Sequence, residues 1–261
     1  MFSMYRNPQV KAMEIYIGTS GYSYPHWAKG VFYPSGLGDD QWLEFYSRQF
    51  NAVELNVTFY QLPDAAMAGT WQKTTPKEFR FVVKGSRFIT HIQRLKDVEE
   101  SLILLLENMA PLKSKISAFL WQLPPGFKKD YQRLKEFCHL LKKMNDFPHA
   151  RHVFEFMDPS WFDEEVYALL KDLRYCLCFA DSPEKIGDEV LTTDFVYLRF
   201  HGGAVLFDSN YSYGELQSWA DKVAGFKGRV KTVYAFFSND ANGYAVLNAQ
   251  RFRLYLLEKK L

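Results

Sequence analysis

This sequence of 261 residues has few cysteines, almost equal numbers of basic and acidic residues, and no long apolar run. Only three cysteines occur, Cys138, Cys176 and Cys178, and an odd number disfavours a disulfide framework. We expect Cys176 and Cys178 to lie on opposite faces of one strand, which would keep them from pairing. A reducing compartment fits this usage best, so we expect a cytoplasmic protein.

The chain contains no run of about 18 apolar residues, which argues against a membrane-spanning helix. Its formal charge of +2 gives no whole-chain argument for binding nucleic acid or a membrane surface. The first residues, MFSMYRNPQVK, lack the apolar stretch of a secretory signal. We expect residues 1–11 to form a flexible leader and residues 12–261 to form a single domain.

Several motifs of metal and nucleotide sites are also missing. The sequence has no His-Glu-x-x-His, no Cys-x-x-Cys and no cluster of histidines, so we predict no metal site. It has no P-loop and no Gly-x-Ser-x-Gly elbow, and no Gly-x-Gly-x-x-Gly follows the first strand pattern. We therefore predict no cofactor.

Short β-branched or aromatic runs alternate with longer segments of helical period, which is typical of βα units around a parallel sheet. The expected strands are 15–19, 52–56, 79–84, 116–122, 152–156, 175–180, 195–200 and 232–237. The expected helices are 39–50, 64–73, 97–109, 130–145, 163–172, 213–225 and 244–258, with only a short or irregular element at 182–194. This pattern predicts an α/β fold, a closed (β/α)8 TIM barrel with outer helices. A doubly wound open sheet is the alternative.

The active sites of such barrels lie at the carboxyl ends of the strands, and polar residues stand at these ends here. Glu54, Glu155 and His201 are the candidate catalytic acid/base residues. The candidate substrate-binding residues are Tyr22, Asn56, Lys84, Asp181, Arg199, Asn239, Asn242 and Gly243. We expect Glu54, Lys84, Glu155, Asp181 and Arg199 to form a mixed-charge ring in one cavity. The alternative is a paired network that only closes the top layer of the barrel.

Two glycine-containing loops predict an anion site. His201-Gly202-Gly203 follows the seventh expected strand, and Asn242-Gly243 directly precedes the last expected helix. Backbone amides of these loops and a helix N-terminus bind phosphate in many barrels. Asn and Gly also simply form turns and helix caps, which is the alternative.

Two kinds of partner fit this pattern. The first is a small anionic ligand, phosphorylated or sugar-like, held by Lys84 and Arg199 and transformed by general acid/base chemistry. The second is nucleic acid, which would stack on rim aromatics beside the basic stretch from Lys84 to Lys96. The rings considered for stacking are Tyr22, Tyr24, Trp27, Phe59 and Tyr60. A scaffold without chemistry would leave the charged ring fully paired.

Ordered motifs along nearly the whole chain resemble the YecE-like family, domain-of-unknown-function family seventy-two. They are Ile17-Gly18-Thr19-Ser20-Gly21-Tyr22-Ser23-Tyr24, Val53-Glu54-Leu55-Asn56-Val57-Thr58-Phe59-Tyr60, Ile89-Thr90-His91, Gln122-Leu123-Pro124-Pro125, Ser160-Trp161, His201-Gly202 and the stretch from Asn239 to Ala249. The resemblance implies a TIM barrel with a polar cleft at its top and no established activity. Met157 stands where the family commonly carries an Arg, so a cation at that position is not expected here.

Overall fold

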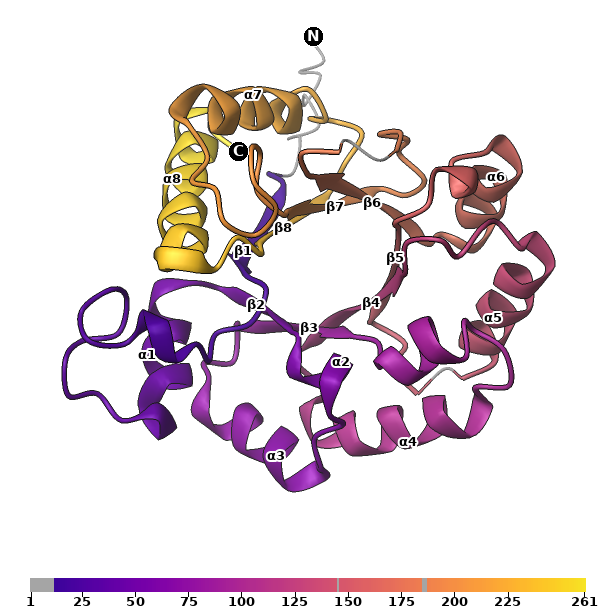
Figure 1. Ribbon diagram of the computed structural model, residues 1–261, viewed down its shortest axis with the longest axis horizontal. Coiled ribbons are helices and arrows are strands. Elements are labelled where there is room, and N and C mark those ends of the chain that lie inside the picture. Colours follow the sequence, from indigo (N-terminus) through magenta and orange to yellow (C-terminus); the bar gives the residue numbers. More distant parts are fainter. Residues whose placement is uncertain (1–11, 145, 185–186) are drawn as a thin grey trace, which may run out of the picture.

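Eight parallel strands form a ring with helices around its outside (Figure 1). The computed structural model describes residues 12–144, 146–184 and 187–261, so the expected leader lies outside the described residues. The strands are β1 Glu14–Thr19, β2 Ala52–Leu55, β3 Arg80–Lys84, β4 Ile116–Leu123, β5 Arg151–Phe156, β6 Cys176–Asp181, β7 Phe195–Phe200 and β8 Thr232–Phe237. Each predicted strand is present, and the predicted TIM barrel is confirmed.

The strands are hydrogen-bonded in the order β1-β8-β7-β6-β5-β4-β3-β2. The two ends of this order, β1 and β2, meet through one bridge between Ser20 and Glu54. Side chains complete the seam, because Asn51 bonds to the Ile17 amide and the Ile15 carbonyl at 2.9 and 2.7 Å. Gly18 permits this close approach, since a Cβ there would lie 2.0 Å from the Ala52 carbonyl oxygen. The ring is therefore nearly closed by strands and sealed by side chains.

The outer helices follow the expected pattern, with one exception. They are α1 Trp42–Gln49, α3 Ala65–Thr74, α4 Glu99–Met109, α5 Tyr131–Lys143, α6 Glu164–Leu173, α7 Tyr213–Ala224 and α8 Tyr244–Glu258. The exception is α2, Val57–Tyr60, a single turn that follows the second strand and that the expected helices did not include. Between β6 and β7 the described residues contain no helix, as expected. No helix within the described ranges is long and apolar enough to cross a membrane.

The interior of the barrel is filled by alternate residues of the strands. This inner cluster includes Ala52, Val82, Ala118, Leu120, Val153, Cys176, Cys178, Tyr197, Tyr234 and Phe236. The expectation that Cys176 and Cys178 lie on opposite faces is wrong, because residues two apart on a strand share a face. Both thiols are nevertheless free and buried. On each strand, the residue two positions beyond this inner cluster also points inward, and these residues lie at the level of the candidate site.

Candidate functional site

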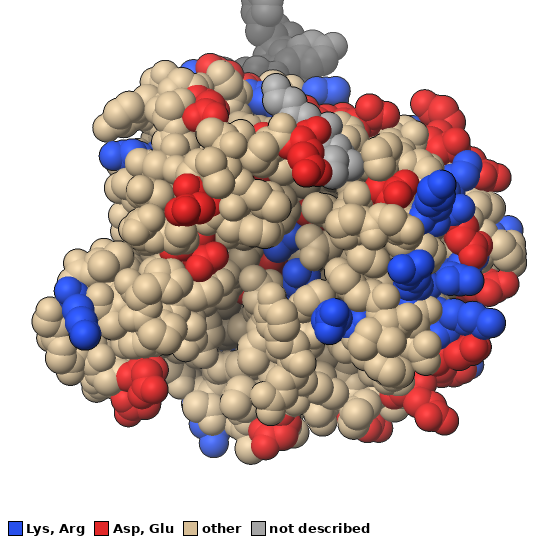
Figure 2. Space-filling view, in the orientation of Figure 1, with Lys and Arg blue, Asp and Glu red and all other residues tan. Residues whose placement is uncertain are grey.

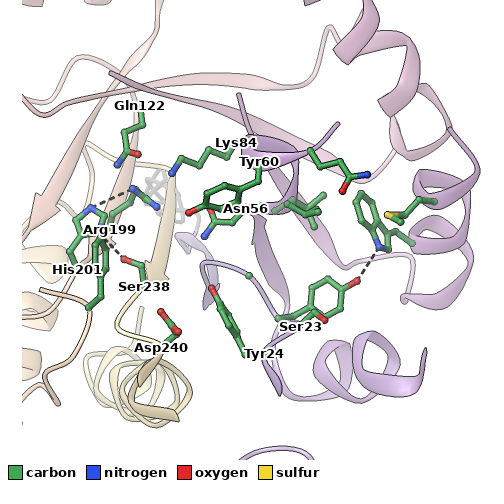
Figure 3. A pocket seen from close by; sticks show the side chains of 18 residues that line it. Ser23, Tyr24, Asn56, Tyr60, Lys84, Gln122, Arg199, His201, Ser238 and Asp240 are labelled. Atoms are coloured by element: carbon green, nitrogen blue, oxygen red, sulfur yellow. Dashed lines mark hydrogen bonds between the residues drawn. The ribbon is translucent and has the colours of Figure 1, made fainter. Parts of the chain in front are cut away.

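A cavity of about 690 Å³ opens at the carboxyl ends of the strands. Figure 3 shows its labelled side chains, which come from the ends of β3, β4, β7 and β8, from the first βα loop and from the segment after β2. Its lining includes Tyr22, Tyr24, Asn56, Tyr60, Lys84, Gln122, Arg199, His201, Phe207 and Ser238. On the surface around the hollow, Lys and Arg gather on the α5 side, whereas Asp and Glu lie over the α7 side (Figure 2).

Arg199 connects two buried glutamates beneath the cavity. Its Nε and Nη2 donate to Glu54 at 3.0 and 2.7 Å, and its Nη1 donates to Glu155 at 2.5 Å. The hydroxyls of Ser20 and Tyr197 also donate to Glu54, at 2.8 and 2.7 Å. All three charged residues are 2% exposed or less. The alternation of β7 explains the arrangement, since Tyr197 and Arg199 point to the same side.

The charges of this network stabilise one another. Burial acts to raise the pKa of Glu54 and of Glu155. The charges of Arg199 and Lys84 act against it, together with hydrogen bonds from Arg199 and Tyr197 to Glu54 and from His201 to Glu155, and the combined effect holds both pKa values below the usual range. Burial acts to lower the pKa of Arg199, and the two carboxylates raise it further than burial lowers it. Glu54 and Glu155 are therefore ionised at neutral pH. With every polar atom engaged, they orient and balance other groups more readily than they accept a proton.

His201 is held by hydrogen bonds on both ring nitrogens. Nε2 lies 2.6 Å from Glu155 Oε1, and Nδ1 lies 2.8 Å from Ser238 Oγ. The ring of Phe207 packs edge-on against the imidazole with a centroid distance of 5.5 Å. His201 is only 1% exposed yet lines the cavity. The imidazole is thus fixed at the cavity wall, which Ser238 also lines.

Lys84 lies at the floor of the same cavity but is not saturated. Its Nζ packs 4.2 Å from the centroid of the Phe59 ring. Among the described residues, none forms an ion pair or hydrogen bond with this ammonium group. Burial and the nearby Arg199 lower the pKa of Lys84 to about 8. The group is therefore a buried cation at neutral pH whose donors point into the cavity (Figure 3).

Asn56 and Tyr22 also reach the cavity, as predicted from their positions. The Asn56 Oδ1 atom is buried and has no hydrogen-bond partner among the described residues. The Tyr22 hydroxyl accepts a hydrogen bond from Trp71 Nε1 at 3.1 Å. Lys84 thus faces the cavity without a hydrogen-bond or ion-pair partner among the described residues, and a second unpaired polar atom, Asn56 Oδ1, is buried beside the cavity wall. Buried polar groups normally find partners.

Asp181 does not join this cluster, so the expectation of a ring of five charged residues is wrong. Its carboxylate accepts a hydrogen bond from Trp219 Nε1 on α7 at 3.0 Å. Because Cys176 and Cys178 face the interior, alternation turns Ala180 inward and Asp181 outward toward the helices. Burial raises the pKa of Asp181. The side chain is a strand-to-helix contact.

The loops after β7 and β8 do not form the expected cradle of amides. Asn239 is fully buried and donates to Ser209 O and Asn248 Oδ1 at 2.7 and 2.8 Å. Asn242 is exposed and donates at 3.5 Å to Asp208, and Gly243 faces Val31 of the first βα loop. These three residues hold the loops together. The carboxylates of Asp208 and Asp240 lie in the same region and oppose an anion there.

Three polar residues of the site were absent from the predicted set. Ser20, Gln122 and Ser238 occupy the same inner level as Glu54, Lys84 and Glu155, and Gln122 donates to Glu155 at 2.8 Å. The alternation of side chains along a strand, which has a period of two residues, could have identified all three. Extending the inner faces of β1, β4 and β8 by two residues from Gly18, Leu120 and Phe236 reaches each of them. Among the residues the structure describes, no group of three His, Cys, Asp or Glu gathers to hold a metal.

Comparisons with known proteins agree with the family resemblance. The family model described as "Protein of unknown function DUF72" matches residues 16–260. The UPF0759 protein YunF of Bacillus subtilis is 27% identical over 271 aligned residues, covering 91% of this chain and 93% of its own. The UPF0759 protein YecE of Escherichia coli is 35% identical over 113 residues, covering 43% of this chain and 39% of its own.

A solved structure supports the same conclusion at the level of the fold. A DUF72 family protein of Thermotoga maritima shares 31% sequence identity with this chain, at a TM-score of 0.81. The match covers 94% of this chain and 99% of that protein. The fold therefore extends over essentially the full length of both proteins.

Proposed function

The chain belongs to the DUF72 family of unknown function, and from that premise we propose that its cavity binds a small anionic, hydroxylated molecule and transforms it by general acid/base chemistry. Phosphorylated or sugar-like compounds are the substrate class. Lys84 and Asn56 are the ligand-binding groups. His201, with Ser238 beside it, is the group that exchanges protons.

One observation carries the proposal: Lys84 is a buried ammonium without a partner in the described chain, directed into a cavity. Glu54 and Glu155 act on this charge from a distance, but neither contacts it. Burying a charge is costly unless it is paired, so an anion from solution would supply the missing direct contact. Arg199 cannot serve in this way, because its donors are occupied by Glu54 and Glu155. Asn56 lines the same cavity, and its buried Oδ1 has no partner among the described residues, so a small rotation of this side chain would let it accept from a hydroxyl or N–H of the same ligand.

The roles of the two glutamates change under this proposal. Both are ionised, nearly fully buried and hydrogen-bonded, and neither lines the cavity. Glu155 orients His201 through Nε2, while Glu54 fixes Arg199. His201 then takes up the acid/base role that Glu54 and Glu155 were candidates to share.

The residues around the mouth of the cavity favour nucleic acid less than a small anion. Arg87, Arg94 and Lys96 are exposed, as that alternative requires. Of the five rings considered for stacking, however, only Tyr60 is exposed, at 80%, whereas Trp27 and Phe59 are buried and the other two are half-buried. A single exposed ring is a poor platform for successive bases.

Protection of the fold by inorganic phosphate tests the anion site. At 100 times its dissociation constant, phosphate should stabilise the native state by about 2.7 kcal/mol relative to sodium chloride of equal ionic strength. We expect this protection at pH 7, its loss in Lys84→Met, and its retention in Lys73→Met, which removes an exposed lysine of α3. Protection should also weaken as pH rises above about 8, where Lys84 loses its proton.

Equal protection of wild type and Lys84→Met would contradict this assignment, as would no protection of wild type by phosphate or by a hexose phosphate. Because Lys73→Met removes the same charge from the surface, it separates binding at the cavity from screening by ions.

A further inference from the structure

A serine, a histidine and a glutamate from three strand ends form one hydrogen-bonded row. β7 and β8 pair with Phe200 beside Phe237, so the next residues, His201 and Ser238, are neighbours above the sheet. His201 Nδ1 lies 2.8 Å from Ser238 Oγ, and His201 Nε2 lies 2.6 Å from Glu155 Oε1. Figure 3 shows the Ser238 side chain beside His201 at the wall of the cavity.

The hydrogen positions in this row follow from the donors and acceptors. Arg199 donates to Glu155, so this carboxylate is ionised and only accepts. The Nε2 atom of neutral His201 must then carry the hydrogen, which leaves the Nδ1 lone pair facing Ser238. The Ser238 hydroxyl has a second acceptor, Phe200 O at 3.1 Å, but the imidazole is nearer. The hydroxyl proton therefore has a base in contact.

We propose that Ser238 is the nucleophile of a Ser238–His201–Glu155 triad that cleaves a small carboxylic ester or thioester. The inference rests on the proposed function for the cavity and its anionic substrate, and it adds a covalent step. Triads are recognised by the geometry and roles of their groups and not by the order of residues along the chain. Here the serine meets Nδ1 and the glutamate meets Nε2, and each nitrogen keeps a single role.

The step balances with water as the second reactant. Ser238 Oγ forms a bond to the carbonyl carbon while its proton moves to His201 Nδ1. Collapse of the tetrahedral adduct breaks the bond to the leaving oxygen or sulfur, which takes that proton. Water then attacks the acyl-serine with His201 as base, and this releases the acid and restores Ser238. The net reaction converts an ester and water into an acid and an alcohol, or a thioester and water into an acid and a thiol.

The surrounding charges suit this chemistry. Lys84 Nζ packs on the Phe59 ring but has no hydrogen bond or ion pair among the described residues, so its N–H donors are available to a developing oxyanion. Glu155 touches His201 and not the cavity, and it is therefore a positioning residue. Phe207 covers the edge of the imidazole at a centroid distance of 5.5 Å and limits access of water to it.

A fluorescent fluorophosphonate tests the nucleophile without knowledge of the substrate. Ser238 Oγ would attack phosphorus, fluoride would leave, and the proton would pass to His201. We expect peptide mass spectrometry to find the adduct on Ser238 in wild type. Ser238→Ala lacks the attacking oxygen and should not be labelled at this position, and labelling of Ser238 in His201→Gln should be at least about 100-fold slower, the usual scale for loss of a general base. Ser23→Ala is the matched control, because Ser23 lines the same cavity and is exposed; it should be labelled like wild type.

Alkylation of Ser238→Cys by iodoacetamide keeps the proposal testable if the phosphonate does not fit. The native cysteines are buried, so the new thiol is the reactive one. Its alkylation should be faster than in the double variant Ser238→Cys/His201→Gln, and Glu155→Gln should slow it while circular dichroism still reports a folded protein.

An adduct on another serine would overturn the triad. So would an unlabelled Ser238 in folded wild type together with equal alkylation of Ser238→Cys in the presence and absence of His201. Phosphate protection that depends on Lys84, with neither labelling of Ser238 nor an effect of His201 on the alkylation of Ser238→Cys, would remove the triad and leave the anion site. Labelling of Ser238 without phosphate protection would support the triad and remove the anion site.

Discussion

Arg199 and Lys84 lie under the same cavity, yet their surroundings differ completely. Arg199 donates to two glutamates and is 2% exposed. Lys84 is 8% exposed, packs on Phe59 and has no ion-pair partner among the described residues. Of the two cations at the floor of the cavity, Arg199 is therefore saturated by carboxylates, and Lys84 faces open space. Arg199 matches the alternative of a paired network, and Lys84 is the group on which the proposed anion site depends.

The two cations should therefore differ in how their removal affects the stability of the fold. A saturated buried ion pair is expensive to break, because removal of one partner leaves the other charge buried. An unpaired buried cation already lowers the stability of the native protein, because its charge is buried without a partner. Its removal should therefore raise the free energy of unfolding. The residue whose loss stabilises the protein is then the better candidate for binding, as in other sites where function opposes stability.

Replacing the saturated cation should have the largest effect. Arg199→Gln leaves two buried carboxylates without their cation, and we expect it to lower the free energy of unfolding by about 3–5 kcal/mol in urea denaturation at pH 7. The matched control is Arg48→Gln, which breaks the exposed pair of Arg48 and Glu44 on α1. That change should cost less than about 1 kcal/mol.

Acid should reduce this difference. In wild type the pKa values of Glu54 and Glu155 are lowered, so their contribution is present above the ordinary value of 4.5 and is lost as pH falls below it. In Arg199→Gln the carboxylates lack this support, and the variant should lose less stability on acidification. A gap between wild type and variant that stays constant from pH 7 to pH 3 would contradict the assignment.

Replacing the open cation should have a smaller effect of opposite sign. The pKa of Lys84 falls from 10.5 to about 8, so charging it costs the folded state about 3 kcal/mol at pH 7, since one pKa unit is worth about 1.4 kcal/mol. We expect Lys84→Met to stabilise the protein by up to this amount. Wild-type stability should rise between pH 8 and 10.5, because there the unfolded chain binds the proton and the native protein does not; the variant should lack this rise.

A second buried lysine provides the control for this prediction. Lys115 Nζ donates to Gln72 O and Thr75 O, each at 2.6 Å. Lys115→Met removes these bonds and should destabilise the fold. Destabilisation by both substitutions would show that Lys84 is a structural lysine like Lys115, and it would contradict the contrast with Arg199.

The rim charges should have the smallest effect on stability. Changing Arg87, Arg94 and Lys96 to Gln together removes three exposed cations, each with an expected effect within about 0.5 kcal/mol. Phosphate protection should remain, because Lys84 is intact. Titration of a labelled single-stranded oligonucleotide at two salt concentrations decides the alternative function. Binding that weakens in the triple variant and with salt would favour nucleic acid at this rim.

Much of the architecture could be predicted from local pattern. Strand runs, helix periods and the polar residues at strand ends predicted the barrel and brought Glu54, Glu155, Arg199 and His201 together correctly, because neighbours along a strand obey a period of two. The same rule was misapplied to Cys176 and Cys178. The wrong placement of Asp181 has the same origin. Cys176 and Cys178 both point into the barrel, so alternation along β6 places Asp181 on the outer face.

By itself, then, the sequence determined which strands form and which polar side chains stand at their ends, because these depend on residues a few positions apart. Only the tertiary structure decided which charges are paired. Arg199 meets Glu54 across 145 positions of the chain, while Lys84 ends beside Phe59 and a cavity. The row from Ser238 to Glu155 likewise depends on the register of β7 with β8. Pairing of this kind is set by the closure of the ring, and no local pattern encodes that closure.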